Sequence, residues 1–196
     1  RSLCNKFKRE HTTVCVFSRA LEKDILIANE VTKRVKNSKI QIVVPVSDLQ
    51  IQYSINKSKD EIITQLKESI NLAKKYFSNI QFTAQDSTRA NLSYLKKILD
   101  IAVRNGVSSI CLPDTTGYST PLEYSTLIKK VKEQFKKNKK IKISAHCHND
   151  LGLATANTLA AIEAGVDHIE CTLGGLGERA GNAPLEEIVA ILNLKY

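Results

Sequence analysis

The sequence predicts an α/β fold in the form of a truncated (β/α)8 (TIM) barrel, with about six of the eight strand–helix units present. Three observations predict it. Short apolar runs alternate with longer amphipathic segments along the chain, which is typical of strand–helix units and a parallel sheet. Nearly every apolar run is followed by polar residues, and a barrel collects its chemistry at the carboxyl ends of many strands. No Gly-rich dinucleotide fingerprint follows any run, which disfavours an open doubly wound sheet.

Six short apolar runs, rich in β-branched residues, are the predicted strands. They span residues 13–17, 40–46, 80–84, 108–112, 141–145 and 168–173. We expect them to show no alternation of polar and apolar residues, because both faces of such a sheet are covered.

The amphipathic segments between the strands are predicted helices. They span residues 22–35, 59–76, 93–105, 121–137, 153–164 and 184–194, and a further helix over residues 2–9 precedes the first strand. Ser58, with Glu61 three residues later, has the spacing of a capping box. Gly106 and Gly165 are expected to end two helices just before the next strand.

Residues 1–196 are expected to form one partial barrel domain, since about six strand–helix units are found where a complete barrel has eight. The composition, 42% hydrophobic and 25% charged, is ordinary for a globular protein, and no apolar run reaches the roughly 18 residues of a membrane helix. The net charge of +9 comes largely from Lys-rich segments such as 129–142, which lack interleaved aromatic residues. We therefore expect neither a membrane nor a nucleic acid as partner.

The five cysteines are an odd number at irregular spacings, with no CxxC pair. Free thiols in a reducing compartment explain this pattern best. We therefore expect a cytoplasmic protein, or a plastid protein if the source is a eukaryote.

Two histidines lie two residues apart in the run AHCHND (residues 145–150), at the end of a predicted strand. Residues two apart in an extended segment point the same way, so both His146 and His148 can face one cation. Two ordinary structural histidines are the alternative. Their pairing at the functional rim of a barrel favours a metal site, with Cys147 pointing away into the packing.

A glycine-rich run, GGLGERAGN (residues 174–182), follows the last predicted strand. Its glycines permit a tight path with backbone N–H groups free to contact an anion or ligand, although a mobile turn has the same composition. Glu178 and Arg179 can pair with each other or orient neighbouring side chains, and Asn182 can give an oxygen to a metal ion. In a further run, DTTGY (residues 114–118), Thr hydroxyls can bind a substrate carboxylate, although this is also an ordinary turn sequence.

Together these segments resemble the second signature region of the 2-isopropylmalate synthases and their relatives, the homocitrate and citramalate synthases. The matching parts are residues 146–153, 159–165 and 174–187, with 113–121 similar to the strand-six segment and weaker matches at 14–25, 44–50 and 82–91. The resemblance covers nearly the whole chain. It is specific for this superfamily of acyl-transferring and lyase barrels and much less specific for the 2-oxo acid.

The resemblance implies an acyltransferase that condenses acetyl-CoA with a small 2-oxo acid. 2-Oxoisovalerate is favoured, as in leucine biosynthesis, and a homodimer is expected for the longer protein. The implied site residues are His146, His148 and Asn182 for a divalent metal ion (Mg2+, Mn2+ or Zn2+), Thr83 and Thr115 for substrate, and Gln85 and Arg179 as catalytic positions. The metal would act as a Lewis acid on the 2-oxo group.

The sequence departs from the family pattern at several places. The Asp-Thr-Thr-Leu-Arg-Asp-Gly-Glu-like strand end, which should supply a metal-binding Asp and a catalytic Arg, does not occur in it. Gln85 stands where the family usually has Glu, Gln41 where a strand usually carries His, and Gln50 is a third such position. Glutamine carries no charge and cannot act as a base. By comparison with the family pattern, approximately strands 3–8 of the barrel are expected to be present. The first two β/α units and any C-terminal regulatory domain are expected to be missing.

These departures leave alternatives open. Residues 117–118 and 185–187 favour 2-isopropylmalate synthase, whereas 45–49 and 151–161 also fit a homocitrate synthase. A citramalate synthase, a catalytically silent barrel fragment of the same family and, less favoured, a lyase of the hydroxymethylglutaryl-CoA type are the other readings.

Overall fold

The computed structural model describes residues 12–196, so the helix predicted over residues 2–9 lies outside the described residues. Six parallel strands form one sheet in the order β1-β2-β3-β4-β5-β6. The strands are β1 (Val14–Arg19), β2 (Ser38–Pro45), β3 (Ile80–Gln85), β4 (Ser109–Asp114), β5 (Lys142–Cys147) and β6 (His168–Glu170). Because the spatial order never reverses, there is no switch point of the kind that defines a doubly wound sheet. The sheet is a half-barrel, which confirms the predicted truncated TIM-barrel fold.

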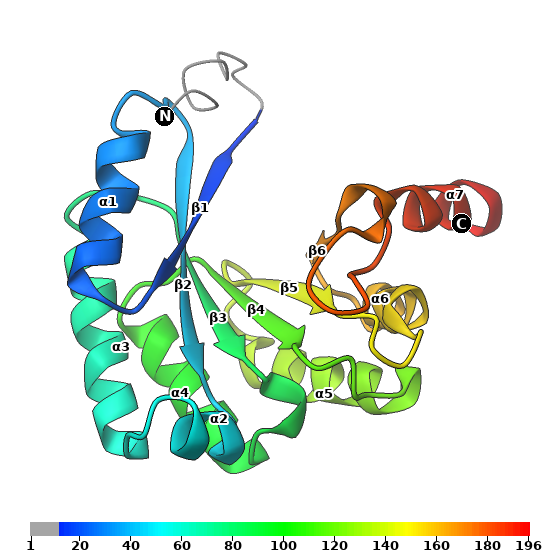
Figure 1. Cartoon of the computed structure of the whole chain (residues 1–196), viewed down its shortest axis with the longest axis horizontal. Helices are drawn as coiled ribbons and strands as arrows, with labels where there is room; N and C mark the ends of the chain where they lie inside the picture. The colour runs from blue at the N-terminus through cyan, green and yellow to red at the C-terminus, as the bar shows by residue number, and fades with distance from the viewer. Residues whose placement is uncertain (1–11) are drawn as a thin grey trace.

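The helices follow the curve of the sheet in chain order, from α1 beside β1 to α6 beside β5 (Figure 1). They are α1 (Glu22–Thr32), α2 (Asp48–Tyr53), α3 (Lys59–Ala73), α4 (Leu92–Arg104), α5 (Pro121–Phe135), α6 (Ala154–Glu163) and α7 (Leu185–Lys195). Two 3-10 turns, η1 (Ser87–Arg89) and η2 (Leu173–Gly175), complete the elements of the described residues. None of these helices is long and apolar enough to cross a membrane.

All six helices predicted within the described residues are present, although α1, α3 and α5 end two or three residues before the predicted bounds. The predicted capping box and the two helix-ending glycines are observed. The Ser58 hydroxyl accepts from the Glu61 N–H at 3.2 Å, and the Glu61 carboxylate accepts from the Ser58 N–H at 2.8 Å, which confirms the capping box. Gly106 and Gly165 have φ of +103° and +88°, the left-handed conformation that ends a helix. α2 was not predicted because six residues are too few to show a helical period, although Ser47 caps it.

Two predictions about the strands were wrong. Strand β6 ends at Glu170, not residue 173, because the chain then turns into η2 and the Thr172 N–H donates to the Ala183 carbonyl instead of continuing the sheet. The expected lack of alternation is also wrong for β2. Ile40 and Ile42 are fully buried under the helices, whereas Gln41 on the inner face is only partly buried.

The inner face of the half-barrel is polar, which explains this alternation. Gln41 donates to the Thr83 hydroxyl at 2.8 Å, and Gln81 donates to Glu170 at 2.7 Å. The Ser144 hydroxyl donates to the same Glu170 oxygen at 3.1 Å. Side chains from β2, β3, β5 and β6 are thereby joined in one hydrogen-bonded network beneath the carboxyl ends of the strands.

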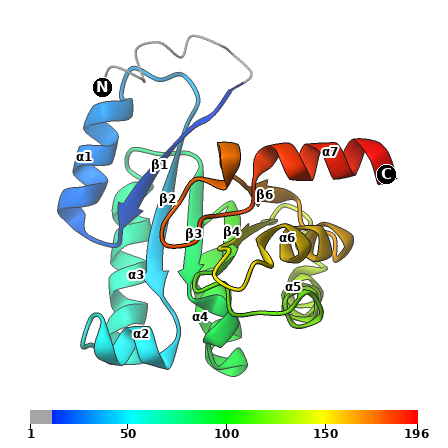
Figure 2. The same ribbon diagram turned by 45° about the vertical axis from the view of Figure 1, so that its right-hand side comes forward.

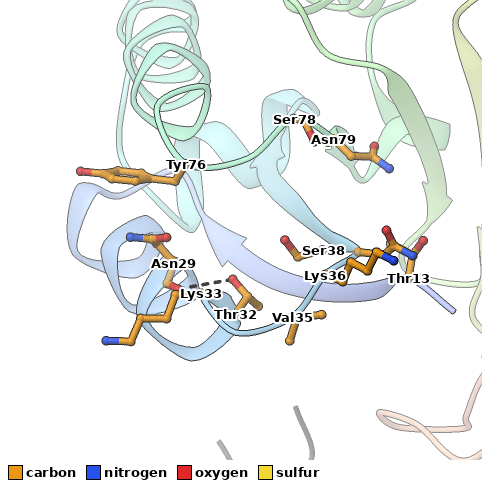
Figure 3. A pocket seen from close by; sticks show the side chains of 11 residues that line it. Thr13, Asn29, Thr32, Lys33, Val35, Lys36, Ser38, Tyr76, Ser78 and Asn79 are labelled. Atoms are coloured by element: carbon orange, nitrogen blue, oxygen red, sulfur yellow. Dashed lines mark hydrogen bonds between the residues drawn. The ribbon is translucent and has the colours of Figure 1, made fainter. Parts of the chain in front are cut away.

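A polar pocket of about 360 Å³ lies at the opposite end of the sheet (Figure 3). Thr13, Ser38 and Asn79 line it, and they stand at the amino ends of β1, β2 and β3. The Thr32 hydroxyl on its wall donates within its own helix, to the Asn29 carbonyl. The pocket is therefore remote from the predicted site, which lies at the carboxyl ends.

Asp167 ties the start of β6 to β5, and its ionisation should contribute to stability. Its carboxylate accepts from the Ile143 N–H at 3.0 Å and from the Lys142 ammonium at 2.9 Å. Burial alone would raise the pKa of Asp167, but these partners outweigh it and hold the pKa below its usual value. A depressed folded-state pKa means that the stabilisation is complete above the unfolded-state value and is lost as pH falls through the folded-state value.

We expect Asp167→Asn to lower the free energy of unfolding by about 1 kcal/mol at pH 7. The difference from the parent chain should shrink steadily once the pH falls below about 4, the unfolded-state pKa of aspartate. Urea denaturation at several pH values measures it. A difference that stays constant down to pH 2 would show that the charge of Asp167 contributes nothing.

Candidate functional site at the carboxyl ends of the strands

The segments that follow β4, β5 and β6 are joined by backbone hydrogen bonds. The His148 N–H donates to the Asp114 carbonyl at 3.2 Å, and the Asn149 N–H donates to the Gly181 carbonyl at 2.9 Å. An isolated antiparallel bridge pairs His148 with Asn182. The glycine-rich run predicted as a ligand loop therefore lies directly beside the histidine pair. Figure 2 shows this run as part of the connection between β6 and α7.

The two histidines face each other. Their Nε2 atoms are 3.2 Å apart, and the rings meet edge to face with an interplanar angle of 88°. Cys147 between them is fully buried in the core on the other side of the strand, as predicted. Two-residue alternation along β5 produces this arrangement, because it sends His146 and His148 to the inner side.

The geometry of this pair fits one shared metal ion. Two nitrogens bound to one ion at about 2.0–2.1 Å lie roughly 3 Å apart. The Nδ1 atoms of both histidines and the Oδ1 atom of Asn182 are buried, and none has a hydrogen-bond partner among the described residues. Among the described residues, no group of three or more His, Cys, Asp or Glu side chains is placed to hold a metal ion, and the third donor predicted from the sequence is the Asn182 amide. The ligand roles themselves remain predictions.

The surroundings favour a neutral His148. Burial, the neighbouring His146 ring and the Arg179 guanidinium lower the pKa of His148. A metal ion binds only the neutral imidazole, so a lowered pKa reduces competition from protons.

Gly177 makes room for the amide of Asn182. A Cβ atom at residue 177 would lie 2.4 Å from the Asn182 Nδ2 atom, so any larger residue there would force the Asn182 side chain to shift. The Asn182 amide in turn donates to the Leu176 carbonyl at 3.2 Å, which turns its Oδ1 atom the other way. The composition of the glycine-rich run therefore has a local steric cause.

Arg179, predicted as a catalytic position, is engaged by neighbouring protein groups. Its Nε and Nη2 atoms donate to the two carboxylate oxygens of Asp150 at 2.5 and 2.9 Å, and Nη2 also donates to the Thr115 carbonyl at 2.7 Å. The hydrogen bonds from Arg179 lower the pKa of Asp150. Glu178 is more distant, 3.7 Å from the guanidinium.

Thr115, predicted to bind substrate, lies beside the end of β3. Its hydroxyl accepts from the Asp86 N–H at 2.8 Å. A hydroxyl that accepts one bond retains a hydrogen to donate, so Thr115 can still bind a carboxylate. Asp86 itself is fully buried, has a φ of +65° and holds Arg89 through both carboxylate oxygens, which fixes this corner.

Thr83 and Gln85 lie on β3, two strands away from the histidine pair on β5. Thr83 is buried in the polar inner network. Gln85 lines a separate pocket of about 530 Å³ at the carboxyl ends of β1–β3, together with Phe17, Val43 and Pro45. The structure thus brings the three predicted metal ligands together, with Thr115 close by, and places Gln85 at the far side of the same end of the sheet.

Glu170 was missed by the sequence analysis. Its side chain is on the inner face of β6, and its Oε2 atom is 3.9 Å from the Nδ1 atom of His146. The available signal was a single carboxylate within the predicted strand 168–173. A carboxylate behind a histidine is the usual arrangement around metal-binding imidazoles.

Comparison with known proteins shows the family of this chain. The HMGL-like family model matches residues 2–195. A 2-isopropylmalate synthase from Lysinibacillus sphaericus is 41% identical over 186 residues, which are 95% of this chain and 36% of that protein. One from Dictyoglomus turgidum is 40% identical over 182 residues, 93% of this chain and again 36% of that protein. The chain thus spans little more than a third of the length of these relatives.

Among solved structures, a Bacillus subtilis HMG-CoA lyase superposes with a TM-score of 0.82 at 22% identity, covering 98% of this chain and 66% of that one. At this identity the likeness shows the fold alone. The predicted resemblance to 2-isopropylmalate synthases is confirmed at the level of sequence, and the chain belongs to the HMGL-like family.

Proposed function

We propose that this chain is the metal-binding part of an acyltransferase of the 2-isopropylmalate synthase type, which condenses acetyl-CoA with 2-oxoisovalerate. The observation that carries the proposal is the cluster of His146, His148 and Asn182, in which the two Nε2 atoms lie 3.2 Å apart and the Asn182 Oδ1 atom has no hydrogen-bond partner among the described residues. A divalent ion held there would polarise the 2-oxo group as a Lewis acid.

The protein's own residues would bind and orient the 2-oxo acid. The Thr115 hydroxyl would donate to the acid's carboxylate while the Asp86 N–H holds its oxygen in place. The Glu170 carboxylate would support the His146 ring from behind. Each of these groups is fixed by hydrogen bonds before the substrate arrives, so little reorganisation is needed.

The pocket beside Gln85 favours an acid with an alkyl group. Phe17, Val43 and Pro45 supply apolar walls. The cationic groups at its edge are engaged already, since Arg19 pairs with Asp24 at 2.7 Å and Lys57 donates to Gln65 at 2.6 Å. The isopropyl group of 2-oxoisovalerate suits such a pocket better than the second carboxylate of 2-oxoglutarate.

The test is release of CoA from acetyl-CoA, followed with a thiol reagent. The chain would be joined to the two preceding β/α units of the Lysinibacillus sphaericus relative, because the metal-binding Asp and the catalytic Arg expected from the family pattern are not in these 196 residues. We expect release that depends on 2-oxoisovalerate and on an intact His146.

Each other outcome has a definite meaning. Release only with 2-oxoglutarate or pyruvate would make the protein a homocitrate or citramalate synthase. A folded chimera that releases no CoA with any of the three acids, even when Gln85 is replaced by Glu, would contradict the acyltransferase proposal and favour a silent barrel.

A further inference from the structure

We propose that Arg179 is a positioning residue that clamps the loops after β4, β5 and β6 around the metal site. The role at a metal site rests on the proposed function, whereas the clamp itself is inferred from the contacts of the Arg179 side chain. The guanidinium reaches Asp150 in the β5 loop and the Thr115 carbonyl in the β4 loop, and its own backbone belongs to the β6 loop.

Two of the three guanidinium nitrogens of Arg179, Nε and Nη2, donate hydrogen bonds to the protein, which leaves Nη1 for a substrate. Its Nε and Nη2 atoms form a two-point fork with Asp150, the geometry in which an Arg–carboxylate pair is strongest and most directional. An ordinary exposed ion pair contributes little to stability, because both side chains must be immobilised. Here the Thr115 carbonyl supplies a third anchor, so the guanidinium is held from two loops at once.

The backbone of Arg179 is strained in a way that glycine would relieve. Its φ is +54°, a left-handed conformation that is unfavourable for a residue with a Cβ atom. The other left-handed positions of this loop, Gly174, Gly175 and Gly181, are all glycine. Such strain persists only where the surrounding structure fixes it, and it is frequent at functional sites. We infer that the contacts of the arginine side chain compensate for this strain.

The clamp acts on the metal ligands through short connections. Asn182 is three residues beyond Arg179, and its N–H donates to the Gly175 carbonyl at 2.8 Å. Asp150 is two residues beyond His148, and the Asn149 N–H donates to the Gly181 carbonyl. Holding Asp150 against Arg179 therefore fixes the distance between the two segments that carry His148 and Asn182.

The same pair also closes the β4 loop. Gly117 has a φ of +55°, and a Cβ atom there would lie 2.6 Å from the Asp150 N–H nitrogen and 2.8 Å from its carboxylate. The β4 and β5 loops are thus in backbone contact, and Arg179 lies across both. Release of the guanidinium should loosen Thr115 and His148 together.

The experiment measures Mn2+ affinity and amide hydrogen exchange of the 196-residue chain. For Arg179→Ala we expect Mn2+ binding about 10-fold weaker, the lower end of what supporting residues around a metal contribute, and faster exchange in residues 114–117 and 148–152. Arg179→Lys, which keeps the charge but not the fork, should lie between the two. Arg104→Ala is the matched control, since Arg104 forms an exposed ion pair with Asp100 on α4.

A double-mutant cycle separates a clamp from a general loss of structure. Asp150→Ala should weaken binding as Arg179→Ala does, and the double variant should be no weaker than either alone. Unchanged Mn2+ affinity and unchanged exchange in Arg179→Ala would overturn the clamp and return Arg179 to a catalytic role. If the parent chain binds no Mn2+, the three residues His146, His148 and Asn182 do not hold the ion by themselves; CoA release by the chimera then decides the proposed function, and the exchange data alone decide the clamp.

Discussion

Replacing His146 by Ala is expected to abolish binding of Mn2+ or Zn2+ at the site. The variant loses one of two imidazole ligands and leaves a single nitrogen and a neutral amide, a set too weak to hold a divalent ion. We expect the dissociation constant to rise by at least about 100-fold, which corresponds to about 2.7 kcal/mol. Isothermal titration of the metal-free chain at pH 7.5 measures it.

His168→Ala is the matched control for this prediction. His168 is an exposed histidine at the amino end of β6, so the same substitution is made at the opposite end of the sheet. Its metal affinity should equal that of the parent chain. If His146→Ala also binds as well as the parent, then the 3.2 Å contact between the two rings is an ordinary hydrogen bond and the metal assignment is wrong.

The fold could be predicted because its signals are local. Strand and helix runs, the Ser58 capping box and the glycines after α4 and α6 each depend on residues a few positions apart. The parallel order of the strands follows from that alternation together with the right-handedness of β–α–β crossovers. What a local pattern could not show is where β6 leaves the sheet, since that depends on Thr172 bonding to Ala183, eleven residues away.

The site was predictable in part for the same reason. His146 and His148 are two residues apart on one strand, so the spacing itself places them on one side. The role of Arg179 needed long-range contacts. Its partners Asp150 and Thr115 lie 29 and 64 residues earlier in the chain, and no spacing in the sequence indicates that they meet.

The polar inner face is the least predictable feature. Gln41, Gln81 and Glu170 come from three strands whose sequences look apolar, and only the register of the sheet puts them in contact. These side chains are hydrogen-bond partners of one another, so the polar groups of the inner face are satisfied without an apolar core there. The half-barrel therefore carries a prearranged polar floor under its candidate site.

The last prediction concerns catalysis, where the residues and the resemblance disagree. The condensation requires a base to take a proton from the methyl group of acetyl-CoA. Gln85 stands at the strand end where the family usually has Glu, and an amide cannot accept that proton. Loss of a general base commonly costs about 100- to 10,000-fold in rate. We therefore expect no measurable CoA release from the 196 residues alone with 2-oxoisovalerate, 2-oxoglutarate or pyruvate.

In the chimera that supplies the first two β/α units, Gln85→Glu should raise kcat by about 100-fold or more, which is the rate enhancement that one general base typically contributes. Gln52→Glu, the same change of charge on the exposed surface of α2, should leave kcat unchanged. The gain should also be lost in the His146→Ala background, since the carbanion equivalent that forms when the base takes the proton would then have no polarised 2-oxo group to attack. Turnover by the isolated chain, or a chimera whose rate is indifferent to Gln85→Glu, would show that the proton is taken by a group elsewhere in the barrel.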